Sequence, residues 1–142
     1  MTAAHALRGG LALDHIGIAV ADLAAAERLY TETLGGRVAV REDLAADGVR
    51  VVFVELRGAL IELLTPAAAG PLARFLDARG EGLHHLAFEV ADLDAALREA
   101  EAGGMRLVDA RPRTGTRGRL IAFLHPSAAR GVLIELVQRP RQ

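Results

Sequence analysis

The chain has 142 residues, of which 51% are hydrophobic and 25% are charged, and its formal net charge at pH 7 is −1. This length and composition predict a single domain over residues 1–142, and they exclude a disordered or collagen-like chain. The 17 basic and 18 acidic residues leave no basic excess that would attract nucleic acid or an anionic membrane.

Several kinds of chemistry are excluded by missing residue types. The chain contains no Cys and no Lys, so a thiolate metal site, a disulfide framework, a P-loop and a Cys or Lys nucleophile are ruled out. Any chemistry must come from His, Asp, Glu, Arg or the single tyrosine, Tyr30. The start of the chain lacks the apolar core of a secretory signal, and no apolar stretch reaches the roughly 20 residues that a membrane span needs. We therefore expect a cytoplasmic protein.

An internal repeat organises the chain. The segment LDHIGIAVADLAAA at 13–26 aligns with LHHLAFEVADLDAA at 83–96, and the tetrapeptide VADL recurs unchanged. Further on, the segment LIELL at 60–64 corresponds to LIELV at 133–137. We therefore expect two modules with the same order of elements.

Each module is predicted to follow the order βαβββ. The opening run alternates between apolar and small or polar residues, which is typical of a strand, and Asp22 or Asp92 then caps a helix that ends at a Gly-Gly pair. Three shorter strands are expected after each helix, at 37–42, 49–57 and 59–65 in the first module and at 105–110, 118–125 and 131–138 in the second. A short helix near 71–79 is expected to connect the modules.

These elements predict an α+β fold. The two βαβββ modules, at about 11–66 and 82–139, stand in tandem. We expect them to form a curved mixed sheet around a metal-containing cleft.

Histidine and glutamate recur at equivalent places of the repeat. His15 and His85 align on the first strands, each on the face opposite the apolar residues and beside small neighbours. Glu62 and Glu135 each interrupt an apolar last strand. Since an unpaired buried carboxylate costs several kcal/mol, such a residue needs a cation or strong donors. If both modules contribute to one cleft, two imidazoles and two carboxylates converge, and a divalent metal ion fits them.

A structural role is the alternative for any single histidine on a strand. Because His and Glu recur at equivalent positions of both modules, a purely structural role does not explain them, and we favour the metal site. For His84, on the opposite strand face from His85, the structural role is preferred, and His5 is assigned no role.

The paired modules with their His/Glu/His/Glu set resemble the vicinal oxygen chelate (glyoxalase/bleomycin resistance/dioxygenase) superfamily. More narrowly, the chain resembles the methylmalonyl-CoA epimerase family. The matching segments cover nearly the whole chain and are LDHIGIAV (13–20), GVRVVFVEL (48–56), IELLTP (61–66), RGEGLHHLAFEV (79–90), RPRTGTRGRLIAFLHP (111–126) and GVLIELV (131–137).

The resemblance implies that His15, Glu62, His85 and Glu135 bind a divalent metal ion, most often cobalt, with zinc, manganese or nickel as alternatives. Position 62 is Gln in some members of the family. The implied activity is a metal-dependent epimerisation of (R)- and (S)-methylmalonyl-CoA, in which the C2 proton is removed and returned through a metal-stabilised enolate. An acyl-CoA thioester is the implied partner, with no nucleic acid and no membrane, and the implied assembly is a homodimer.

Epimerisation requires an acid/base group on each side of the planar enolate. We expect Glu135 to be one of them. Some relatives place the other, a non-ligand Glu, on the third strand where this chain has Val51, so the sequence does not identify the second group. Glu55 shares the strand parity of Val51, and we expect it to be a solvated residue at the end of the strand.

Four arginines crowd a glycine-containing loop, at Arg111, Arg113, Arg117 and Arg119. Most are expected to be solvated, and some to contact the phosphates of coenzyme A. A turn and a substrate contact are equally good interpretations of His125.

Three other functions stay open. A glyoxalase I-type lyase, acting on the methylglyoxal–glutathione hemithioacetal, can share the ligand set, but the segments LHHLAFEV and FLHPSAARGVLIEL favour the epimerase. A ring-cleaving dioxygenase needs an open iron site with two His and one carboxylate, in which Glu62 would occupy an extra position. A metal-free small-molecule-binding protein of the same fold would have no use for the four ligands.

Overall fold

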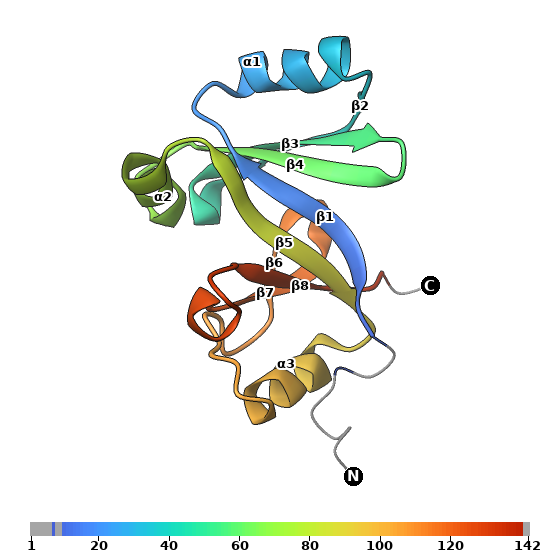
Figure 1. Cartoon of the computed structure of the whole chain (residues 1–142), viewed down its shortest axis with the longest axis vertical. Coiled ribbons are helices and arrows are strands. Elements are labelled where there is room, and N and C mark those ends of the chain that lie inside the picture. The colour runs from blue at the N-terminus through green and yellow to red at the C-terminus, as the bar shows by residue number, and fades with distance from the viewer. Residues whose placement is uncertain (1–6, 8–9, 141–142) are drawn as a thin grey trace. The chain divides into compact units, whose positions relative to one another are not determined.

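The computed structural model describes Leu7 and residues 10–140 of the chain (Figure 1). Contacts within the chain define two compact units. The central unit is His15–His84, and the terminal unit comprises the described residues up to Asp14 and from His85 onward. A single domain over residues 1–142 and the predicted module boundaries remain predictions. None of the helices in the described part of the chain has the length and apolar character that a membrane crossing needs.

The central unit follows the βαβββ order of the first predicted module. Its elements are β1 (Ala12–Ala19, shared with the terminal unit), α1 (Leu23–Arg28), the π-helical turn η2 (Leu29–Thr33), β2 (Arg37–Leu44), η3 (Ala45–Asp47), β3 (Val49–Leu56), β4 (Ala59–Pro66) and α2 (Pro71–Arg79). The strand order is β2-β3-β4-β1, with β1 parallel to β4 and the other pairs antiparallel. The Asp22 carboxylate caps α1 by accepting a hydrogen bond from the Ala25 N–H at 3.0 Å, as predicted.

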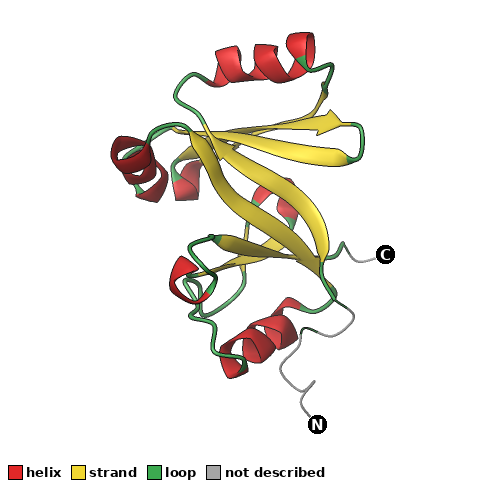
Figure 2. Cartoon of the chain, in the orientation of Figure 1, coloured by secondary structure: helices red, strands yellow, loops and turns green. Residues whose placement is uncertain are grey.

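Both faces of this sheet are apolar. One face buries Val52, Val54 and Leu63 beneath α1, and the other buries Val51 and Phe53 on the side of α2. Figure 2 shows α1 and α2 on opposite sides of β3 and β4. Strands covered on two sides explain why VRVVFVEL reads as a nearly continuous apolar run.

The terminal unit has the same order with shorter outer strands. Its elements are β5 (Gly82–Val90, which begins in the central unit), α3 (Leu93–Ala102), β6 (Arg113–Thr114), η4 (Thr116–Gly118), β7 (Leu120–Leu124), η5 (Pro126–Ala128) and β8 (Ile134–Gln138). The strand order is β5-β8-β7-β6, with β5 parallel to β8 and the other pairs antiparallel. Leu93 and Leu97 of α3 pack on Ala122 and Leu136, which forms the core of this unit. The predicted α+β fold with mixed sheet pairing is confirmed.

The strand expected at 105–110 is wrong. This segment makes only an isolated bridge between Leu107 and Leu124. Its irregular path has a cause in one side chain, because the Asp109 carboxylate accepts hydrogen bonds from the Phe123 N–H at 2.9 Å and from Arg113 Nε at 3.2 Å. A side chain thus takes a backbone donor that a regular ladder would use.

The last strand begins later than expected, at Ile134 rather than at 131. Arg130 and Gly131 have φ values of 57° and 87°. These left-handed conformations turn the chain, so strand geometry cannot begin before them.

Candidate functional site

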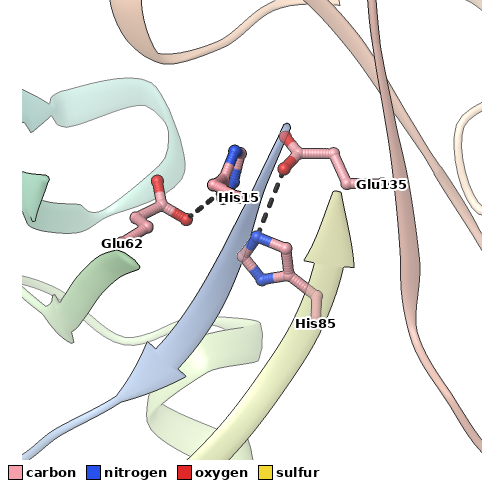
Figure 3. Close-up of side chains that lie close together, drawn as sticks. All are labelled: His15, Glu62, His85 and Glu135. Carbon is pink, nitrogen blue, oxygen red and sulfur yellow. Dashed lines mark ion pairs between the residues drawn. The ribbon is translucent and has the colours of Figure 1, made fainter. Parts of the chain in front are cut away.

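The first predicted pair, His15 and Glu62, lies within the central unit. His15 is on β1, and Glu62 on β4 is the register partner of Gly17, two residues further along β1. Both side chains therefore lie on the same face of the parallel strand pair. The distance between His15 Nε2 and Glu62 Oε1 is 3.5 Å, and the two side chains are 1% and 6% exposed (Figure 3). The rings of His15 and Phe53 form a T-shaped contact, with 5.2 Å between the ring centroids.

The second pair, His85 and Glu135, repeats this arrangement within the terminal unit. His85 is on β5, and Glu135 on β8 is the register partner of Ala87. His85 Nε2 lies 3.2 Å from Glu135 Oε1, and the two side chains are 2% and 6% exposed (Figure 3). Phe123 packs edge-on against His85, with 5.6 Å between centroids. The structure thus places each histidine beside the glutamate of its own module.

The chemistry of these donors suits a divalent metal ion. Each of the four residues is buried, and each offers one imidazole nitrogen or carboxylate oxygen as a ligand atom. Carboxylates buried at this depth require cations or strong donors. Imidazole and carboxylate together are typical ligands of zinc, cobalt, manganese and nickel. The residues present therefore fit the metal that the sequence predicts.

Val51, which stands where some relatives have a Glu, and Glu55 lie in different environments. Val51 is buried in β3 and carries no titratable atom. Glu55 is exposed, and its carboxylate lies 2.7 Å from Arg37 Nη2. This hydrogen bond and the charge of Glu55 raise the pKa of the Arg37 guanidinium. Glu55 is thus the solvated residue at a strand end that we expected.

His84 and His125 have structural contacts. His84 packs edge-on against Phe75 of α2, with 4.8 Å between centroids, which agrees with the structural role predicted for it. The His125 Nδ1 accepts a hydrogen bond from the Ser127 N–H at 3.0 Å and caps η5. The turn interpretation of His125 therefore has direct support. His5 lies outside the described residues.

Three of the four loop arginines are engaged by carboxylates. Arg117 and Arg119 both bind Asp14, and Arg119 Nη2 also lies 2.9 Å from a Glu89 oxygen. Arg113 is paired with Asp109, and Arg111 is exposed.

The expectation that most of these arginines are solvated is wrong for Arg117 and Arg119, because their acidic partners on β1 and β5 lie 30 to 105 residues away along the chain. The alternation of side chains along β1 could have indicated that Asp14 has a cationic partner. Asp14 occupies the same strand face as Ile16 and Ile18, where a carboxylate needs a cationic partner.

Comparison with known proteins identifies the superfamily to which the chain belongs. The model of the Glyoxalase/Bleomycin resistance protein/Dioxygenase superfamily matches residues 14–123. The ethylmalonyl-CoA/methylmalonyl-CoA epimerase of Cereibacter sphaeroides is 43% identical over 129 residues, which cover 89% of this chain and 96% of that protein.

Solved structures of methylmalonyl-CoA epimerases also match the chain. The methylmalonyl-CoA epimerase of Mycobacterium tuberculosis aligns with a TM-score of 0.86 at 42% identity, over 91% of this chain and 88% of that one. A methylmalonyl-CoA epimerase in complex with methylmalonyl-CoA and NH4+ aligns with a TM-score of 0.85 at 37% identity, over 90% of this chain and 94% of that one. The chain therefore belongs to this superfamily and, within it, to the methylmalonyl-CoA epimerase family.

Proposed function

We propose that the chain interconverts (R)- and (S)-methylmalonyl-CoA. The observation that carries this proposal is the buried His–Glu pair found at equivalent positions of both repeats, in a chain that belongs to the epimerase family. Support for an acyl-CoA thioester as substrate comes from the related epimerase whose structure holds methylmalonyl-CoA.

His15, Glu62, His85 and Glu135 are the residues that would hold a divalent metal ion, with Co²⁺ as our first choice and Zn²⁺, Mn²⁺ or Ni²⁺ as alternatives. When bound, such an ion supplies positive charge that lowers the energy of the negative charge developing on the thioester oxygen. The apolar strands around each pair exclude water, which strengthens every electrostatic interaction there.

Proton transfer at C2 is the task of the chain's own side chains. Glu135 is proposed to accept the proton from one face of C2 and, in the reverse direction, to return it. The electron pair of the broken C–H bond then moves toward the thioester carbonyl, which gives a planar enolate. Return of a proton to the opposite face inverts the centre. A homodimeric assembly and a cytoplasmic location remain predictions.

Deuterium exchange tests this function directly. The metal-loaded protein is incubated with methylmalonyl-CoA in D₂O, and the C2 position is followed by NMR, with methylglyoxal plus glutathione as the parallel reaction. We expect deuterium at C2 and equilibration of the two epimers. Lactoylglutathione formation far faster than C2 exchange would transfer the assignment to the glyoxalase class. A purified protein that binds no divalent metal and exchanges no C2 proton would favour a binding protein.

A further inference from the structure

Each histidine of the two pairs packs against a phenylalanine, and the two contacts have the same geometry. The rings of His15 and Phe53 are 5.2 Å apart between centroids, with an interplanar angle of 86°. Those of His85 and Phe123 are 5.6 Å apart, also at 86°. Aromatic rings attract one another in T-shaped arrangements at centroid distances of about 4.5–7 Å. The recurrence of this contact in both repeats indicates that the phenylalanine belongs to the repeated site.

The strand register brings each phenylalanine beside its histidine. In each unit three register partners form a row across the sheet, consisting of a phenylalanine, a proposed ligand glutamate and a small residue. The rows are Phe53, Glu62 and Gly17 in the central unit, and Phe123, Glu135 and Ala87 in the terminal unit. Directly paired residues point to the same side of a sheet, and the histidine is two residues before the small residue on the same strand face. The two rings therefore lie on one face, on either side of the strand that carries the glutamate.

The two phenylalanines are held in place in different ways. Phe53 is fully buried in an apolar cluster on the side of α2. Phe123 is half-buried, and the guanidinium of Arg113 lies over its ring, 5.7 Å from the centroid. Asp109 accepts hydrogen bonds from Arg113 Nε and from the Phe123 backbone N–H, at 3.2 and 2.9 Å. An arginine fixed by an aspartate thus holds the ring of Phe123 where apolar cover is incomplete.

A histidine that binds a metal needs its ring held in one plane. The backbone ladder fixes where the imidazole begins, but rotation about its χ2 torsion is broad. In both pairs the Nε2 atom faces the glutamate, at 3.5 Å for His15 and 3.2 Å for His85 (Figure 3). The lone pair of this nitrogen lies in the ring plane, so a tilt of the plane turns it away from a metal ion. A T-shaped partner opposes the tilt, because the perpendicular contact is lost when the ring rotates.

We propose that Phe53 and Phe123 are positioning residues that hold the imidazole planes of His15 and His85 in the orientation for metal binding. The inference rests on the proposed function, since it concerns the metal ion which that function uses. The phenyl rings supply no ligand atom. They act by restricting each imidazole before the metal binds, so that less conformational entropy is lost on binding. A phenylalanine that only filled the core could instead be replaced by any apolar side chain of similar size.

Variants of Phe123 separate positioning from core filling. Phe123→Leu removes the ring but keeps an apolar side chain, and we expect Co²⁺ to bind about tenfold more weakly, at the lower end of the loss seen for partners of metal ligands. The visible absorption spectrum of the bound Co²⁺ should change as well, because it reports ligand geometry. Phe123→Met, with a side chain nearer in length to phenylalanine, should show the same loss and keeps the test valid if the leucine variant does not fold. Phe123→Tyr keeps the ring at this half-buried position and should restore the wild-type spectrum, with affinity within about threefold of wild type.

Phe75→Leu is the matched control, because Phe75 makes the same kind of contact with a histidine that is not a proposed ligand. Its ring forms a T-shaped contact with His84, with 4.8 Å between centroids, and the guanidinium of Arg79 lies over it at 5.6 Å. We expect this variant to lose stability, as Phe123→Leu does, when the metal-free protein is unfolded with urea. Its affinity for Co²⁺, measured by calorimetry, and its Co²⁺ spectrum should remain those of wild type.

Three results would overturn the proposal. The first is wild-type affinity and an unchanged Co²⁺ spectrum in Phe123→Leu or Phe123→Met. The second is an equal loss of affinity in Phe75→Leu, which would show a general packing defect. The third is a Phe123→Tyr variant that binds Co²⁺ no better than Phe123→Leu. A wild-type protein that binds no divalent metal would instead overturn the metal site of the proposed function.

Discussion

The central and terminal units arise from one sequence repeat but are stabilised differently. In the central unit, β2, β3 and β4 each have eight residues, and apolar clusters cover both sheet faces. In the terminal unit, β6 has only two residues. Here the loop between α3 and β7 is fixed by ion pairs, in which Asp14 binds two arginines and Asp109 binds a third.

The His–Glu pair is the feature that both units keep. In each unit the histidine is on the first strand and the glutamate on the last strand, and these two strands are parallel neighbours. The pair therefore depends only on this parallel ladder, and the outer strands can shorten without moving it. We therefore expect the two pairs to be equivalent as metal ligands while their surroundings differ.

The largest expected effect tests that equivalence. We expect His15→Ala and His85→Ala each to weaken binding of Co²⁺ by at least about a hundredfold, because even residues that only support a ligand contribute 10- to 100-fold. Metal content by elemental analysis and affinity by calorimetry measure this. His84→Ala, which removes the ring packed on Phe75, should leave metal content unchanged. A wild-type metal content in either ligand variant would remove that histidine from the site.

The two glutamates are expected to differ, which sharpens the comparison. Glu135→Gln keeps an oxygen ligand but removes a base, so we expect measurable metal and a loss of at least about a hundredfold in the epimerisation rate. Glu62→Gln also keeps an oxygen ligand, and its rate should fall less than tenfold if Glu62 is a ligand only. The NMR exchange assay measures both rates. Equal rate losses in the two variants, at equal metal content, would contradict a proton-transfer role specific to Glu135.

Sequence alone predicted the parts of the molecule that depend on local patterns. The alternation of LDHIGIAV, the capping residues Asp22 and Asp92 and the helix at 71–79 all appear as expected. The same alternation placed His15 opposite the apolar face of β1.

What the sequence missed depends on contacts between distant residues. The irregular path at 105–110 follows from a hydrogen bond between the Asp109 side chain and the backbone of Phe123. Strand β2 also contains a register shift between Val38 and Val40. Val38 and Val40 therefore pack on opposite faces, and strand parity counted from the start of the strand would assign the residues from Val40 onward to the wrong face.

The ion pairs of the terminal unit should contribute more to folding than those of the central unit. Asp14 is 9% exposed and binds both Arg117 and Arg119. Its replacement leaves two cations partly buried, so we expect Asp14→Asn to lower the free energy of unfolding by roughly 3 kcal/mol. Asp43→Asn, which breaks an exposed pair with Arg50 in the central unit, should cost less than about 1 kcal/mol. Urea unfolding of the metal-free protein measures both, and similar values would show that the two units do not differ in this way.

The smallest effect is a pH dependence that should come from the terminal unit. Burial acts to raise the pKa of Glu89, but hydrogen bonds from Arg139 and Arg119 outweigh it, and the pKa is lowered overall. A carboxyl group with a lowered pKa in the folded state stabilises the fold above its unfolded pKa of about 4.3, and this stabilisation is lost as the pH falls below that value.

We therefore expect Glu89→Gln to be less stable than wild type by up to about 1 kcal/mol at pH 7, and the difference to shrink toward zero as the pH is lowered to about 3.

Arg139 is the more exposed of the two donors, with 58% of its side chain accessible against 10% for Arg119. Arg139→Gln should accordingly give the same pH profile with a smaller amplitude, and salt should screen this part first because exposed charges are screened more than buried ones. Urea unfolding of metal-free protein at several pH values measures the profile. If the stability difference between wild type and Glu89→Gln were the same at pH 3 as at pH 7, the contribution of Glu89 would be packing rather than charge.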